Sequence, residues 1–202
     1  MGVKLIRSAY STIIREASDA SAALFDRNGD VVAQAELIPI QLGPMSEIFR
    51  ACAAVDPVDS LEEGDFYITN DPYSGGQHLQ DVFIYSPVFF EGELVAFAGT
   101  VAHHLDLGGG NPGLTTEAVD VHAEGFIFPP GKYNHARDWE GRGALKRLVA
   151  ANIRVPGQTI GDFDAQFAAN AVGAERVKQL CRKYGVQKVD RAMAELIAYS
   201  ES

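Results

Sequence analysis

The chain has 202 residues, of which 47% are hydrophobic and 22% are charged, and its formal net charge is −10. This length suits one domain with its own core, or one domain with a small addition. The negative charge disfavours nucleic-acid binding, because phosphate contacts require clustered Lys and Arg. We find no sustained apolar segment, so we expect no membrane span and a cytoplasmic protein whose two cysteines, Cys52 and Cys181, stay reduced.

The first half of the chain combines helical and strand patterns. In chain order, the patterns predict a helix over 6–17, a β-hairpin over 21–35, a helix over 45–55, and strands over 64–70, 81–90 and 93–104. The hairpin is predicted by Asn28-Gly29, which lies between two apolar runs. The last two strands are nearly continuous in apolar character, which is typical of strands buried on both faces.

The second half begins with an irregular segment and ends in helices. Residues 105–139 are rich in Gly and Pro and show little periodicity, so we expect a functional or mobile loop there. Helical periodicity returns over 141–154, 159–185 and 187–201. The order predicts an α+β fold, with a mixed sheet in the front half and a helical C-terminal tail. Residues 1–139 would carry the site, and residues 140–202 would form a helical region of the same domain.

Three of the five histidines lie in two glycine-flanked stretches, 70–82 and 101–113. His78 and Asp81 are three residues apart on an expected turn, where both can face one ion. His103 and His104 are neighbours at the end of a strand and point to opposite faces, so at most one should be a ligand.

Acidic residues surround these histidines. Asp106 follows the His pair, and Asp71 begins the turn that precedes His78. Mixed imidazole and carboxylate ligands suit a divalent ion such as Mn, Fe or Zn, with positions left open for catalysis. The alternative is that these side chains cap turns or pair with buried carbonyls. We interpret His122 and His135 as structural or surface residues.

Several long motifs, in register, resemble the hydantoinase B/oxoprolinase family. They include "GDFYITNDPYSGGQHLQDVFIYSPVF", "AHHLDLGGGNPG" and "EGFIFPP". That family includes the B-type subunits of ATP-dependent N-methylhydantoinase and 5-oxoprolinase-type enzymes, and a related subunit of acetone carboxylase. The resemblance implies an A-type, actin-like partner that uses ATP to phosphorylate the substrate. It also implies a divalent ion, manganese in acetone carboxylase, held by His78, Asp81 and His103, with Asp71 as a weaker fourth ligand.

The chain departs from the family pattern in two ways. Gln41 stands in "IPIQLG" where the family has a histidine, and an amide cannot shuttle protons near neutral pH. Typical members are also much longer, and we expect the C-terminal half of the family to be absent here. We therefore expect a fragment, a split subunit or a short relative, with the missing half as a separate chain in a hetero-oligomer.

The sequence leaves several functions open. Our first hypothesis is a metal-dependent subunit of an ATP-dependent cyclic-amide hydrolase, in which His104 or Asp106 takes a proton and Glu124 is a more distant candidate. A subunit of an ATP-dependent ketone carboxylase is the alternative within the same class. A non-catalytic module that binds a partner subunit is the alternative from another class.

Overall fold

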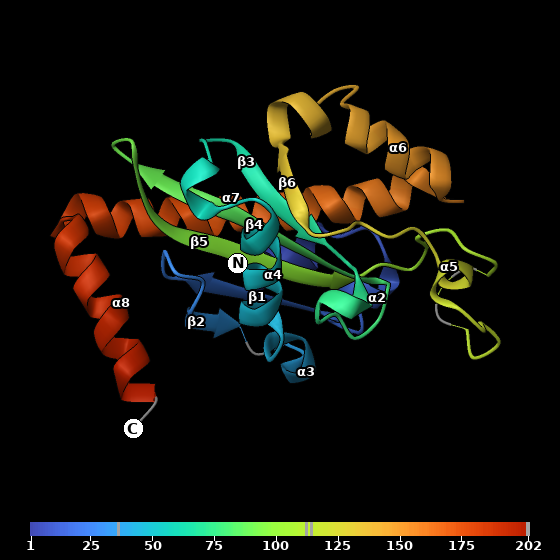
Figure 1. Cartoon of the computed structure of the whole chain (residues 1–202), viewed down its shortest axis with the longest axis horizontal. Coiled ribbons are helices and arrows are strands. Elements are labelled where there is room, and N and C mark those ends of the chain that lie inside the picture. The colour runs from blue at the N-terminus through green and yellow to red at the C-terminus, as the bar shows by residue number, and fades with distance from the viewer. Residues whose placement is uncertain (36, 112, 114, 201–202) are drawn as a thin grey trace.

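A six-stranded sheet forms the centre of the molecule (Figure 1). The computed structural model describes residues 1–35, 37–111, 113 and 115–200. The strands lie in the order β2-β1-β5-β4-β3-β6, and each pairing between neighbours is antiparallel. In chain order they are β1 (Ala20–Phe25), β2 (Val31–Ala35), β3 (Asp65–Thr69), β4 (Asp81–Phe90), β5 (Glu93–His103) and β6 (Gly131–Asn134). The predicted α+β class is confirmed.

Helices flank the sheet and form the C-terminal part of the chain (Figure 1). They are α1 (Gly2–Ser8), α2 (Thr12–Arg15), α3 (Pro39–Leu42), α4 (Met45–Val55), α5 (Val121–Glu124), α6 (Ala144–Asn152), α7 (Pro156–Tyr184) and α8 (Val186–Ser200), with short turns η1 (Val58–Ser60), η2 (Pro72–Ser74) and η3 (His135–Trp139). The longest helix, α7, has proline at its first position, where the missing N–H costs no hydrogen bond. Residue 201, the last of the final predicted helix, lies outside the described residues.

The sheet is buried on both faces, with α4 on one side and α7 on the other (Figure 1). Alternation along β4 divides its side chains between these helices. Phe83 and Tyr85 belong to the cluster that contains residues of α4, whereas Val82 and Ile84 belong to the cluster that contains Phe163 of α7. This explains the nearly continuous apolar pattern of the strand.

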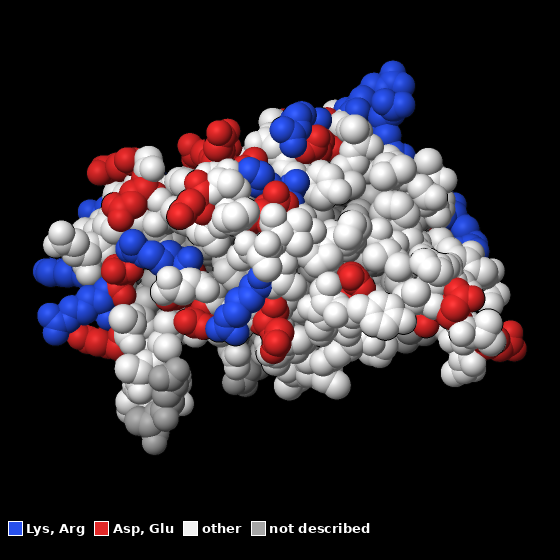
Figure 2. All heavy atoms as spheres, in the orientation of Figure 1, with Lys and Arg blue, Asp and Glu red and all other residues white. Residues whose placement is uncertain are grey.

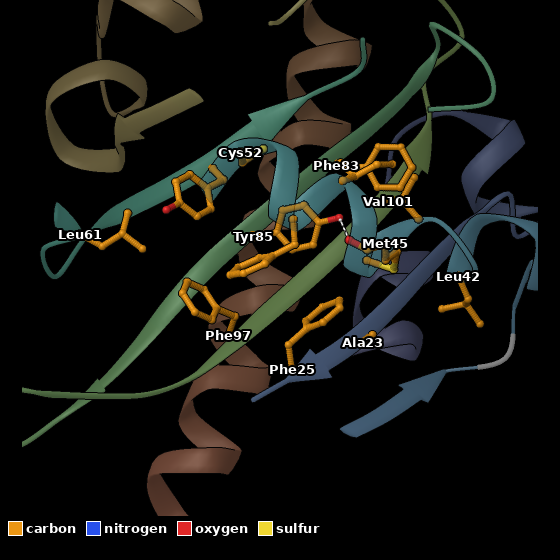
Figure 3. Packing of buried hydrophobic residues seen from close by; sticks show 13 residues of the cluster. Ala23, Phe25, Leu42, Met45, Cys52, Leu61, Phe83, Tyr85, Phe97 and Val101 are labelled. Atoms are coloured by element: carbon orange, nitrogen blue, oxygen red, sulfur yellow. Dashed lines mark hydrogen bonds between the residues drawn. The ribbon is translucent and has the colours of Figure 1, made fainter. Parts of the chain in front are cut away.

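The packing of α4 also places the short helix α3. Figure 3 shows Leu42 of α3 and Met45 of α4 in the same cluster as Tyr85 of the sheet. The Tyr85 hydroxyl donates a hydrogen bond to the Met45 carbonyl at 2.7 Å, which ties the start of α4 to β4. Because Leu42 faces this core, Gln41 beside it is held buried near the sheet, with only 3% of its surface exposed.

The single N-terminal helix predicted over 6–17 is wrong. The chain instead forms α1 and α2, separated by extended backbone from Ala9 to Ser11. The break has a partner far away in sequence: Asp162 of α7 accepts hydrogen bonds from the backbone N–H groups of Tyr10 and Ser11, at 2.6 and 3.0 Å. A buried carboxylate thus satisfies donors that a continuous helix would have used itself.

The segment 105–139 is less irregular than predicted. It contains α5, the strand β6 and the π-helical turn η3. Strand β6 pairs with β3 at the edge of the sheet, from Asp65 with Asn134 to Ile68 with Gly131. Its sequence, Gly-Lys-Tyr-Asn, has no apolar alternation, so only the non-local pairing identifies it as a strand.

The surface agrees with the charge balance of the sequence. In Figure 2 acidic and basic side chains are interspersed on the visible, described face, without a continuous basic area. Among the described helices, none combines the length and apolar character needed to cross a membrane.

Candidate metal site

The candidate site lies where β4 begins and β5 ends. Asp81 is the first residue of β4, His103 is the last of β5, and the two are paired in register. Directly opposed residues in antiparallel strands point to the same face, so this pairing brings the carboxylate to the imidazole. The Asp81 Oδ1 atom lies 2.9 Å from His103 Nδ1.

His78 reaches the same carboxylate from the preceding turn. Its Nδ1 atom lies 3.0 Å from Asp81 Oδ2, and the Asp81 N–H donates to the His78 carbonyl at 3.0 Å. The ligand atoms of His78, Asp81 and His103 all lie within 4.8 Å of one another. We call these three residues the metal triad. The side chains of Asp81 and His103 are 2% and 6% exposed, whereas that of His78 is 47% exposed, so the triad opens to solvent on one side.

Asn70 holds the loop that carries His78. Its side-chain amide donates to the carbonyls of Leu79 and Phe126, at 2.7 and 2.9 Å. Its side-chain oxygen accepts from the Phe128 N–H at 2.7 Å. Asn70 is completely buried, so these bonds form away from competing water. One side chain therefore connects the loop before β4 with the segment after α5.

The spacing of the triad suits a divalent ion. Two neighbouring ligands around an ion with bonds of about 2.1 Å are roughly 3 Å apart, as the two nitrogen–oxygen pairs of the triad are. The donor set of two imidazoles and one carboxylate suits Mn, Fe or Zn. The residues present therefore fit such an ion.

Of the two neighbouring histidines, only His103 faces the triad. His104 points to the opposite face of the sheet, where its ring packs against Phe163 with centroids 4.3 Å apart. Its Nε2 atom lies 2.9 Å from Gln166 Oε1. Complete burial lowers the pKa of His104, while the nearby Asp162 carboxylate acts in the opposite direction.

The structure does not bring Asp71 or Asp106 into the triad. Asp71 caps the turn η2 and accepts hydrogen bonds from the Tyr73 N–H and the Ser74 hydroxyl, both at 3.0 Å. Asp106 forms an ion pair with Arg154 at 2.9 Å and also accepts from the Arg154 backbone N–H at 2.6 Å. Both carboxylates are thus committed to local structure.

Glu124 lies beside the loop that carries His78. It is the last residue of α5 and lines a hollow together with Gln77 and Leu79, the two neighbours of His78. Its backbone carbonyl is 3.5 Å from Nε2 of Gln80, which precedes Asp81. The roles of Asp71, His104, Asp106 and Glu124 remain predictions.

Three residues that contact the triad or its neighbours were not predicted as site residues. Gln41 donates through Nε2 to Asp19 Oδ1 at 2.8 Å and lies 3.5 Å from Asp81 Oδ1. Its Oε1 atom is buried and has no hydrogen-bond partner among the described residues. The backbone carbonyl of Asp19 accepts from the His103 N–H at 3.0 Å. The contacts of Asp19 and Gln166 join residues that are far apart in sequence, so spacing along the chain gives no signal for them, whereas Gln41 is marked by the motif "IPIQLG".

The chain is similar to a known protein family and to solved structures. A family model described as "Hydantoinase B/oxoprolinase" matches residues 1–202. The chain is 38% identical over 210 residues to the B-type subunit of a putative D-/L-hydantoinase from Pseudomonas sp. strain NS671, and the match covers 100% of this chain and 34% of that protein. The crystal structure of the ATP-dependent caprolactamase from Pseudomonas jessenii matches with a TM-score of 0.80 and 31% identity, over 97% of this chain and 37% of that one.

A more distant structure shares the fold alone. Nucleotide-free acetone carboxylase matches with a TM-score of 0.86 and 21% identity, over 96% of this chain and 26% of that chain. The chain spans about a third of the length of the hydantoinase and caprolactamase subunits that it matches.

Proposed function

Because the chain belongs to the hydantoinase B/oxoprolinase family, we propose that it is the metal-dependent subunit of an ATP-dependent cyclic-amide hydrolase. Hydantoin and caprolactam, after which two relatives are named, are both cyclic amides. We propose further that an A-type partner subunit uses ATP to phosphorylate the amide oxygen, and that this chain acts on the activated ring within a hetero-oligomer.

The observation that carries the proposal is the position of Asp81 between two imidazoles, with one side of the triad open. His78, Asp81 and His103 would hold a divalent ion, Mn, Zn or Fe. When bound, the ion supplies Lewis acidity and a nucleophilic water near neutral pH. Before an ion binds, the buried carboxylate holds both imidazoles in place, because each of its oxygens lies within hydrogen-bond distance of one Nδ1 atom, and a bound ion would replace these two contacts.

Other side chains near the triad would support the Asp81 carboxylate and accept a proton. The Gln41 amide, beside Asp81 Oδ1, restrains the carboxylate from the side of α3. For the proton acceptor we favour Glu124, which lines the hollow next to the loop of His78. His104 is buried on the opposite face of the sheet and Asp106 is paired with Arg154, so neither is placed to accept a proton at the triad.

A non-catalytic, partner-binding module is the second candidate. ATP-dependent ring opening separates the two, measured on the chain assembled with its A-type subunit and with hydantoin, 5-oxoproline and caprolactam as probes. The first proposal expects activity that His78→Ala reduces at least about 100-fold. Ring opening that His78→Ala leaves unchanged would contradict the metal role, and carboxylation of a ketone instead would identify a carboxylase.

A further inference from the structure

We propose that Gln166 is a positioning residue for the metal triad, acting from the opposite face of the sheet. This inference rests on the proposed role of the triad as a metal site. Gln166 lies within α7, and its side chain is completely buried. It donates through Nε2 to the Val82 carbonyl at 2.9 Å, and its Oε1 atom lies 2.9 Å from His104 Nε2.

The two partners of Gln166 are the sequence neighbours of two triad residues. Val82 follows Asp81 at the start of β4, and His104 follows His103 at the end of β5. A single side chain therefore connects the two strand ends that bring the carboxylate and the imidazole together. A shift of one strand end relative to the other would lengthen one of the two hydrogen bonds, in a buried place where water cannot replace it.

Hydrogen-bond chemistry fixes the orientation of both side chains. The Val82 carbonyl can only accept, so the amide nitrogen of Gln166 must face it and the amide oxygen must face His104. The proton of the His104 ring is therefore on Nε2, and the ring is a donor to α7. The backbone N–H of His104 donates to the Gln80 carbonyl at 2.9 Å, which connects His104 to the residue just before Asp81.

Asn170 provides a matched control on the next turn of α7. It is also completely buried, and its side-chain amide donates to the Ile84 carbonyl at 3.1 Å and lies 3.2 Å from the Ser86 hydroxyl. These contacts resemble those of Gln166, but they lie further along β4 from Asp81 and none reaches β5. If the buried amides of α7 only stabilise the fold, removing either one should have the same effect on metal binding by the triad.

The experiment compares the full chain with Gln166→Met and Asn170→Leu, which keep side-chain size and remove the hydrogen bonds. The dissociation constant and the visible spectrum of bound Co²⁺ report on the triad, and thermal unfolding reports on stability. We expect Gln166→Met to weaken Co²⁺ binding about 10-fold and to alter the spectrum, since loss of a ligand's supporting partner costs about 10- to 100-fold. Asn170→Leu should lower the melting temperature about as much as Gln166→Met does, but its Co²⁺ affinity should stay within about 3-fold of that of the parent chain.

A third variant separates the two hydrogen bonds. Gln166→Glu can still accept from His104 but cannot donate to Val82 as a carboxylate, so its Co²⁺ affinity should lie between those of the parent and Gln166→Met. It also serves if Gln166→Met does not fold. Equal Co²⁺ affinity in the parent and the Gln166 variants, or an equal loss in Asn170→Leu, would overturn the proposal.

A readout without metal distinguishes this proposal from the proposed function. Imidazole NMR signals of isotope-labelled His103, recorded in metal-free protein, report on its hydrogen bond to Asp81. We expect these signals to shift in Gln166→Met and to stay unchanged in Asn170→Leu. If the parent chain binds no Co²⁺, the metal function fails, and these signals alone decide whether Gln166 positions the strand ends.

Discussion

Replacing Asp81 by Asn should both destabilise the chain and abolish its response to metal. The Asp81 side chain is 2% exposed, and its contact with His103 is buried, whereas the half-exposed ring of His78 can reorient in water. Asn keeps an oxygen that can accept from His103 but loses the charge, so we count the difference between a buried hydrogen bond to a charged group and one to a neutral group, about 1 kcal/mol. For a domain of this size, about 1 kcal/mol lowers the melting temperature by roughly 2–4 °C, so the metal-free variant should melt about 2–4 °C lower.

The assay is thermal unfolding with and without a divalent ion, with Asp65→Asn as the control. Asp65 is also largely buried on a strand and accepts hydrogen bonds, but from Asn134 and the Glu62 backbone, away from the triad. An ion at about 100 times its dissociation constant should stabilise the parent and the control by about 2.7 kcal/mol. Asp81→Asn should show no such increase, and a full metal-induced increase in that variant would refute the reasoning.

Three further outcomes follow from other contacts. Gln41→Glu should lower the unfolding free energy by about 1–3 kcal/mol, because a third carboxylate would face the two that the amide now contacts, and unchanged urea unfolding would contradict this. Arg154→Leu removes the side-chain ion pair with Asp106 and the hydrogen bonds to the carbonyls of Gly108 and Gly109, so amide hydrogen exchange around these glycines should accelerate, and unaltered protection would exclude this role. Burial raises the pKa of Cys52 to about 12 and raises that of Cys181, so both thiols should resist alkylation at about pH 8 until the chain is unfolded, and rapid labelling of the folded chain would be the contrary result.

The central part of the candidate site could be predicted because its contacts are local. His78 and Asp81 are three residues apart, and His103 is carried to Asp81 by two consecutive strands joined by a tight turn. The alternation of a strand then separates His103 from His104 without any knowledge of the fold. The same local patterns identified the main strands and the helices of the C-terminal part.

The failures all involve partners that are distant in sequence. The N-terminal helix is interrupted because Asp162 binds its backbone, and β6 is a strand because β3 pairs with it. The ion pair of Arg154 with Asp106 also joins residues that are distant in sequence, and the catalytic role of Asp106 stays a prediction. Periodicity and spacing describe only neighbours along the chain, so none of these contacts had a signal in the sequence.

The most direct test of the central claim is the metal content of the purified chain, measured by elemental analysis alongside His78→Ala and His122→Ala. Both histidines are exposed, but only His78 belongs to the triad, so His122→Ala controls for the loss of an exposed imidazole. The account predicts about one divalent ion per chain in the parent and in His122→Ala, and a content reduced at least about 10-fold in His78→Ala. Equal metal content in all three proteins would contradict it.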